Sequence, residues 1–145
     1  MLPGEDKESS YSLTKQERIR SGLIFQQLLR ENQSFFVYPF KCFYLVSPRN
    51  EIDNTNTIGI SIPKKRLKRA VDRNRMKRII KEVYRIHYKN RLDYFYGQKN
   101  IRVAFLLVYV SKKKENFDYI NKKMDEIIRL LLSLDCIKTE SYENS

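Results

Sequence analysis

Hydrophobic positions recur at helical spacing near both ends of the chain. Towards the N-terminus they predict a helix over Ser21 to about Glu31. Its apolar positions are Leu23, Ile24, Phe25, Leu28 and Leu29. Towards the C-terminus the same spacing predicts a helix over about Asn116–Leu134. Its apolar positions are Phe117, Ile120, Met124, Ile127, Ile128 and Leu131.

Three stretches between these helices carry the pattern of β-strands. Ser34–Val46 is rich in aromatic and β-branched residues, and Pro39 should bend this strand or place it at a sheet edge. Thr57–Ile62 alternates isoleucines with small residues, so one face should enter the core and the other should allow close approach to the backbone. Ile101–Tyr109 is apolar almost throughout, which is typical of a buried strand.

A third helix is predicted between the second and third of these strands. Its apolar face consists of Met76, Ile79, Ile80, Val83 and His87. Leu67 and Val71 would project from the opposite face if the helix began earlier. We therefore expect it to start near Ala70–Arg73, with Lys64–Arg69 as a connecting loop and with Leu67 and Val71 packed by a separate turn.

The order helix, strands, helix, strand, helix predicts an α+β domain or a small two-layer α/β sandwich. A length of 145 residues suits one domain. We expect a disordered leader over residues 1–13, a single folded domain over 14–134 and a flexible tail over 135–145.

The positive charge is concentrated in one segment of the chain. The net charge is +12, and residues 64–91 hold thirteen Lys or Arg against two acids. The other 117 residues hold sixteen bases and fifteen acids. A nearly neutral domain with one cationic element is typical of a protein that binds a polyanion, with nucleic acid first and an anionic membrane surface second.

The remaining composition predicts a cytoplasmic protein. The longest apolar run, Val103–Val110, has eight residues, whereas a membrane-spanning helix needs about twenty. The first residues are acidic and polar and lack the core of a signal peptide. Cys42 and Cys136 have no metal-ligand spacing, and Cys42 is expected to be a small core residue.

The outer face of the third helix is almost entirely positive. It carries Arg75, Lys77, Arg78, Lys81, Arg85 and Lys89, with Asn74 among them. Like charges four residues apart destabilise a helix, and a solvated face normally mixes signs. Nucleic-acid contact therefore explains this stripe better than a plain solvated surface does.

Asn74 stands between Arg73 and Arg75 and has two interpretations. Its amide can donate and accept hydrogen bonds, so it could hold a phosphate or a 2′-hydroxyl, or orient the flanking guanidinium groups. Asparagine is also favoured at helix starts, so a capping role is the alternative, and the two roles are compatible.

The segment Gly59–Arg85, "GISIPKKRLKRAVDRNRMKRIIKEVYR", resembles the signature of the protein subunit of bacterial ribonuclease P. In that family a strand ends in a Ser-Lys-Lys-like step, and a short loop leads to Ala-Val and then to Arg-Asn-Arg-x-Lys-Arg at a helix start. Lys64–Lys65, Ala70–Val71 and Arg73–Arg78 match in place. Pro63 replaces the usual serine, so a contact through that hydroxyl is lost. The resemblance extends more weakly over about Leu13–Leu134.

The resemblance implies a fold and a set of partners. The fold is a two-layer α/β sandwich with a mixed sheet of about four strands, three helices and a left-handed βαβ crossover, similar to the second domain of a small-subunit ribosomal protein. The partners are the catalytic ribonuclease P RNA and precursor tRNA, with the protein monomeric in a one-to-one complex with the RNA. The reaction is hydrolysis that removes the 5′ leader, and Mg²⁺ is bound mainly by the RNA and not by the protein.

The resemblance also implies two sets of site residues. The RNA-binding set is Lys64, Lys65, Arg73, Asn74, Arg75, Lys77, Arg78, Lys81 and Arg85. A cleft between the first helix and the sheet holds the single-stranded leader and is lined by Arg18, Phe25, Leu29, Phe40 and Phe43. The aromatic strand independently suits this role, because bases stack on aromatic side chains in basic grooves. For any single ring, a place in the core remains the alternative.

The chain shows no catalytic constellation of its own. Its one histidine, His87, lies on the predicted apolar face, and no paired carboxylates stand in a basic setting suited to two metal ions. The sequence therefore predicts a subunit that positions RNA rather than a protein catalyst.

Three other functions stay open. A ribosomal RNA-binding protein would show a similar cationic helix without needing an aromatic cleft. A helix-turn-helix DNA-binding protein should offer more Gln, Ser or Asn to base edges. A membrane-surface helix would leave its apolar face free, whereas here the sheet needs that face as core.

Overall fold

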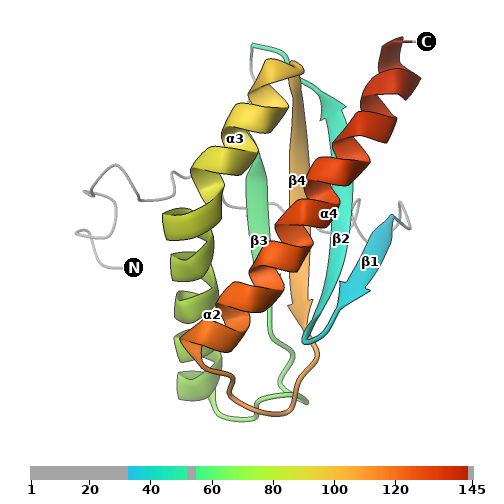
Figure 1. Ribbon diagram of the computed structural model, residues 1–145. Coiled ribbons are helices and arrows are strands. Elements are labelled where there is room, and N and C mark those ends of the chain that lie inside the picture. The colour runs from blue at the N-terminus through green and yellow to red at the C-terminus, as the bar shows by residue number, and fades with distance from the viewer. Residues whose placement is uncertain (1–32, 52–54, 144–145) are drawn as a thin grey trace.

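A four-stranded mixed sheet forms one layer of the protein, with the strands in the order β1-β2-β4-β3 (Figure 1). The computed structural model describes residues 33–51 and 55–143, with side chains as far as residue 133. The strands are β1 (Ser34–Val37), β2 (Phe40–Pro48), β3 (Thr57–Ser61) and β4 (Ile101–Tyr109). β2 pairs antiparallel with both β1 and β4, whereas β3 and β4 are parallel.

Pro39 ends a strand rather than bending it. The sequence predicted one strand over Ser34–Val46, but β1 and β2 form an antiparallel hairpin whose turn holds Tyr38 and Pro39, joined by a cis peptide bond. Proline has no N–H for the strand ladder, so a turn accommodates it better than a strand interior does. The hairpin makes β1 an edge strand.

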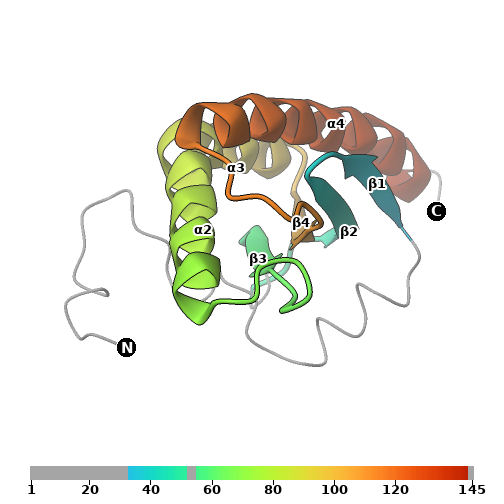
Figure 2. The same cartoon turned by 90° about the horizontal axis from the view of Figure 1, so that it is seen from below.

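The helices form the second layer, and all of those described lie on one side of the sheet (Figure 2). α2 (Ala70–Val83), a π-helix η3 (Tyr84–Tyr88) and α3 (Lys89–Gln98) connect β3 to β4, and α4 (Phe117–Glu143) follows β4. In Figure 1, with the helices towards the viewer and both parallel strands running downward, β4 lies to the right of β3, which is the left-handed sense of crossover. The predicted α+β class with a mixed four-stranded sheet is confirmed.

The core lies between these two layers. Phe40 and Phe105 from the sheet are fully buried with Tyr84 and Met124 from the helices. The Tyr84 and Phe105 rings meet edge to face, with centroids 5.6 Å apart. The Tyr96 hydroxyl donates to the Leu131 carbonyl at 2.7 Å and so joins α3 to α4. This packing fixes the orientation of α2, whose outer side is then turned to solvent.

The π-helix explains why the prediction for His87 was wrong. Buried residues recur every four positions along this helical segment, at Met76, Ile80, Tyr84, Tyr88, Leu92 and Tyr96. In an uninterrupted α-helix each step of four residues turns about 40° too far, so five steps would rotate the buried face by about 200°. The wider π-turn at Tyr84–Tyr88 takes back part of that rotation. As a result Tyr88 is buried, whereas His87 is exposed and its ring meets Phe117 edge-on.

The predicted start of the cationic helix is confirmed, because α2 begins at Ala70 and the preceding Lys64–Arg69 is a loop. Leu67 packs into the core as expected, but Val71 is 56% exposed, so the prediction that both are packed holds only for Leu67. α4 continues past Leu134 to Glu143. The predicted leader and the helix over Ser21 to about Glu31 lie outside the described residues. The domain boundaries and the flexible tail over 135–145 stay predictions.

Candidate nucleic-acid interface

The predicted RNA-binding residues occupy the β3–α2 loop and the outer side of α2. Six of them are exposed: Lys64, Lys65, Asn74, Arg75, Arg78 and Lys81. Arg73, Lys77 and Arg85 are half-buried. The helical period places the cations on the side opposite Met76 and Ile80, which are buried against the sheet. The predicted cationic face of α2 is therefore present and turned to solvent.

Arg73 supports the loop in addition to carrying charge. Its Nη1 donates to the carbonyl oxygens of Leu67 and Lys68, each at 2.9 Å. The backbone N–H groups of Arg66 and Leu67 also donate to the Pro63 carbonyl, at 3.0 and 3.4 Å. These bonds hold the loop in one conformation, so the lysines on it stand at defined positions.

Arg85 is engaged with an acid on its own helix. Its Nε and Nη2 donate to the two carboxylate oxygens of Glu82, at 2.7 and 2.9 Å. Such a bidentate pair neutralises the charge that the sequence assigned to RNA contact. The cationic stripe is therefore strongest over the first part of α2, around Arg75 and Arg78, and weakens towards η3.

Asn74 has no capping role. α2 begins four residues earlier at Ala70, Arg69 takes the N-cap position, and no side chain caps the helix. Asn74 is exposed within the second turn, between Arg73 and Arg75. Its predicted contact with a ligand or with the flanking arginines stays a prediction.

Phe40 and Phe43 lie on opposite faces of the sheet. Phe40 is fully buried on the helix side, where the centroids of the Phe40 and Tyr109 rings are 5.8 Å apart. Its assignment to the leader cleft was therefore wrong. Residues three apart in a strand cannot share a face. Phe43 is half-buried on the other face, where it packs against Ala104 and Leu106. The other predicted cleft residues, Arg18, Phe25 and Leu29, lie outside the described residues.

The face that holds Phe43 combines aromatic and positive side chains. The Lys41 Nζ lies 5.2 Å from the centroid of the Phe43 ring, within range of a cation–π interaction. Phe36 pairs with Lys41 across the hairpin and so shares this face, and its side chain is 59% exposed. We call Phe36, Lys41 and Phe43 the open-face cluster. The sequence showed Phe36 only as one aromatic among several, because the hairpin register that places it beside Lys41 was not predicted.

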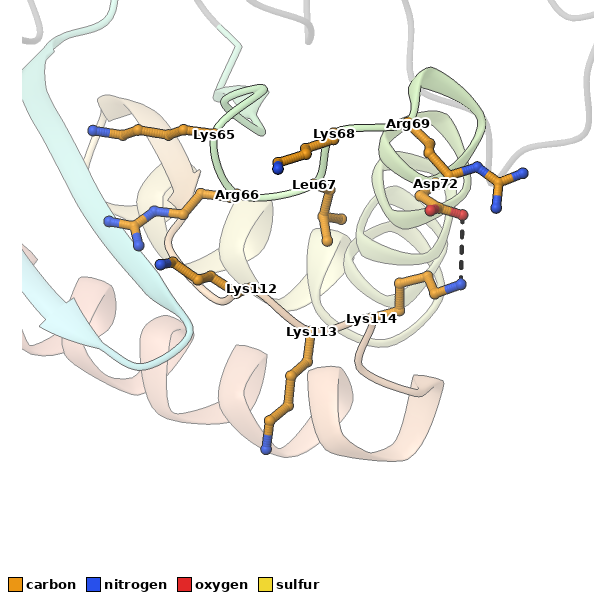
Figure 3. Close-up of a pocket in the computed structure, with 9 residues that line it drawn as sticks. All are labelled: Lys65, Arg66, Leu67, Lys68, Arg69, Asp72, Lys112, Lys113 and Lys114. Atoms are coloured by element: carbon orange, nitrogen blue, oxygen red, sulfur yellow. Dashed lines mark ion pairs between the residues drawn. The ribbon is translucent and has the colours of Figure 1, made fainter.

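A second basic segment, missed by the sequence reasoning, joins the β3–α2 loop. β3 and β4 are parallel neighbours, so the loops that follow them leave the sheet at the same end. The β4–α4 loop carries three consecutive lysines to that end, and the two loops line a cavity of about 660 Å³ (Figure 3). Its lining residues are Lys65, Arg66, Leu67, Lys68, Arg69, Asp72, Lys112, Lys113 and Lys114. The lysine run was visible in the sequence, but only the sheet order brings it beside the signature loop.

The described residues include no cluster of three or more His, Cys, Asp or Glu side chains that could hold a metal ion. Cys42 is fully buried, as predicted, and burial raises the pKa of its thiol far above the usual range. Within the part of the chain that the structure describes, no helix has both the length and the apolar content needed to cross a bilayer.

Comparisons with known proteins agree with one another. Residues 13–132 match the family model described as Ribonuclease P. The chain is 28% identical over 122 residues to the ribonuclease P protein component of Porphyromonas gingivalis, covering 83% of this chain and 88% of that one. It is 30% identical over 120 residues to that of Clostridium novyi, covering 83% and 94%. The solved structure of the Staphylococcus aureus RNase P protein matches with a TM-score of 0.60 at 20% identity, over 79% of this chain and 94% of that chain, which shows a shared fold.

Proposed function

The chain belongs to the ribonuclease P protein family, and on that premise we propose that it binds both the catalytic RNA and the 5′ leader of precursor tRNA. As a member of this family, the chain is a protein component of an endoribonuclease that works with a ribonuclease P RNA. We propose further that two separate surfaces of this chain meet the two RNAs and so assist removal of the leader.

The observation that carries the proposal is the uncompensated positive charge on the outer side of α2. Both acids of this helix are already paired with bases, Asp72 with Lys114 at 3.6 Å and Glu82 with Arg85 at 2.7 Å. Arg75 and Arg78 are exposed on the outer side between them. A positive surface that its own acids leave uncompensated supports binding to phosphates, since each contact releases counterions from the RNA.

The open-face cluster supports leader binding. A single-stranded RNA binds well where aromatic rings can stack on bases beside a cation that meets the backbone. Phe36 and Phe43 with Lys41 provide that combination on one face of the hairpin. Arg18, Phe25 and Leu29 are proposed to line the other side of the same cleft.

The division of labour with the RNA is also a proposal. We assign the hydrolysis, and most of the Mg²⁺ binding, to the catalytic RNA, and we assign positioning and charge neutralisation to the protein. The pairing of Asp72 and Glu82 with bases supports this assignment, because those carboxylates face Lys114 and Arg85 rather than one another. We expect a one-to-one complex with the RNA in the cytoplasm.

Reconstitution tests the proposal directly. The full-length protein should allow a bacterial ribonuclease P RNA to remove the leader from precursor tRNA at Mg²⁺ concentrations too low for the RNA alone. The protein without RNA should cut nothing under the same conditions. Cleavage by the protein alone would contradict the assigned roles. Tight binding to a ribosomal RNA fragment without any stimulation of cleavage would favour a ribosomal RNA-binding protein instead.

A further inference from the structure

The cavity between the β3–α2 and β4–α4 loops holds far more positive than negative charge. Seven of its nine lining residues are Lys or Arg, and the acid among them, Asp72, lies 3.6 Å from Lys114. We propose that this cavity seats phosphates of an RNA backbone and that Lys112 supplies one of the contacts. The inference rests on the proposed function and adds the β4–α4 loop to the RNA-binding surface.

The charge of the cavity favours an anionic occupant. Cations gathered from two loops repel one another, and one paired carboxylate among the lining residues compensates little of that repulsion. Binding of a phosphate would therefore relieve the repulsion.

Both walls of the cavity are held in place by the fold. On the β3–α2 side, Leu67 is buried and Arg73 donates to two loop carbonyls. On the β4–α4 side, the fully buried Ser111 accepts the Lys113 N–H at 3.0 Å, and the Tyr109 hydroxyl donates to the Lys113 carbonyl. Lysines presented by fixed backbones lose less entropy on binding than lysines on a flexible tail. The cavity is therefore organised before a ligand arrives.

The lining chemistry favours an RNA backbone over an acidic protein segment. Leu67 is the one apolar side chain of the lining, so the described cavity offers little surface for peptide side chains. A sugar–phosphate backbone needs mainly cationic donors. Lys65 belongs both to this lining and to the predicted RNA-binding set, so the cavity continues the surface proposed for RNA. The phosphates could belong to the catalytic RNA or to precursor tRNA.

The β4–α4 loop offers its own matched variants. In Figure 3 Lys112 extends towards the side of Lys65 and Arg66, whereas Lys113 points away from the other labelled side chains. Lys112→Ala in the full-length protein should weaken binding to a bacterial ribonuclease P RNA about five- to tenfold near physiological salt, and should lower the log–log salt slope by roughly one. Lys113→Ala should lose less. Lys99→Ala, next to the other end of β4, should bind as the unchanged protein does.

Two binding measurements distinguish the sources of the phosphate. A loss confined to the catalytic RNA places its phosphates in the cavity. A loss seen only when the assembled holoenzyme binds precursor tRNA places the substrate there. If Lys112→Ala matches Lys99→Ala in both measurements, the cavity is not an RNA site and the inference is overturned. The proposed function is judged separately, by whether the unchanged protein stimulates cleavage at low Mg²⁺.

Discussion

The two faces of the sheet carry aromatic residues in opposite settings. On the face covered by the helices, Phe40 and Tyr44 are buried in the main core. On the other face, which no described helix covers (Figure 2), Phe43 is half-buried and Lys41 lies over its ring. All four residues belong to β2, so one strand serves the stability of the fold on one side and an open aromatic and basic surface on the other.

The difference shows that the alternation of residues along the strand, and not the residue type, decides whether an aromatic side chain lies in the core or on the open face. Aromatic content marked the whole stretch as a candidate for base stacking, but only alternate residues can face the same side of a sheet. Cys42 lies on the covered face, and burial there raises the pKa of its thiol. Lys41, its neighbour in sequence, is exposed. Substitutions on the two faces should therefore differ in kind.

The largest expected effect is that of Phe40→Ala on the covered face. Removing a fully buried ring should lower the free energy of unfolding by about 3–5 kcal/mol. Denaturant unfolding of the free protein measures this loss. The folded fraction should still prefer tRNA with a leader over mature tRNA as the unchanged protein does. Unaltered stability together with a selective loss of leader binding would reverse our assignment of the faces.

Phe43→Ala on the open face should instead reduce binding selectively. If one base stacks on this ring, the loss should be about 1–3 kcal/mol for precursor tRNA bound by the holoenzyme, with no change for mature tRNA. Phe43→Leu is the matched control, since it keeps apolar packing against Ala104 and Leu106 but removes the aromatic face. Equal losses for both RNAs, with a large fall in melting temperature, would assign Phe43 to the core.

Arg78→Ala or Arg75→Ala tests the outer side of the helical layer as a surface distinct from both sheet faces. Each should weaken binding to the catalytic RNA about five- to tenfold and lower the salt slope by roughly one, whether or not a leader is present. Arg85→Ala is the control, because its charge is already paired with Glu82. Titrations at several salt concentrations measure both quantities. Unchanged slopes for Arg75 and Arg78 with intact circular dichroism would indicate a plain solvated face.

The smallest expected effect is that of Lys41→Gln. It removes the cation beside Phe43 but keeps much of the side-chain length, so the affinity for precursor tRNA should fall about two- to fivefold. Mature tRNA should bind as before, and the melting temperature should stay within error because Lys41 is exposed. A loss that does not depend on the leader would separate Lys41 from the open-face cluster.

Much of the fold followed from local patterns. The positions of Leu67 and Val71 predicted a helix start near Ala70–Arg73, and α2 begins at Ala70. Strand alternation alone places Phe43 on the face of Lys41, as the structure does. The cationic stripe was also predicted, since helical period and charge are both written in consecutive residues. These properties depend on backbone geometry that repeats every two or every 3.6 residues.

Other features depended on contacts that no local period contains. The π-helix places Tyr84 and Tyr88 in the core, and it thereby leaves His87 outside the apolar face. Arg85 is paired with Glu82, although its place in the stripe predicted an RNA contact. The predicted cleft included Phe40 because family resemblance assigned it there, whereas packing against Tyr109 places it in the core.

The sequence by itself determined where the helix starts, which side of it is positive and which strand residues alternate. Each of these follows from neighbours within a few positions. The tertiary structure alone decided that the lysines of the β4–α4 loop stand beside the β3–α2 loop. That meeting requires β3 and β4 to pair in parallel, and the pairing depends on the crossover and on the core between sheet and helices. Segments so distant along the chain meet only because burying the shared core fixes the order of the strands.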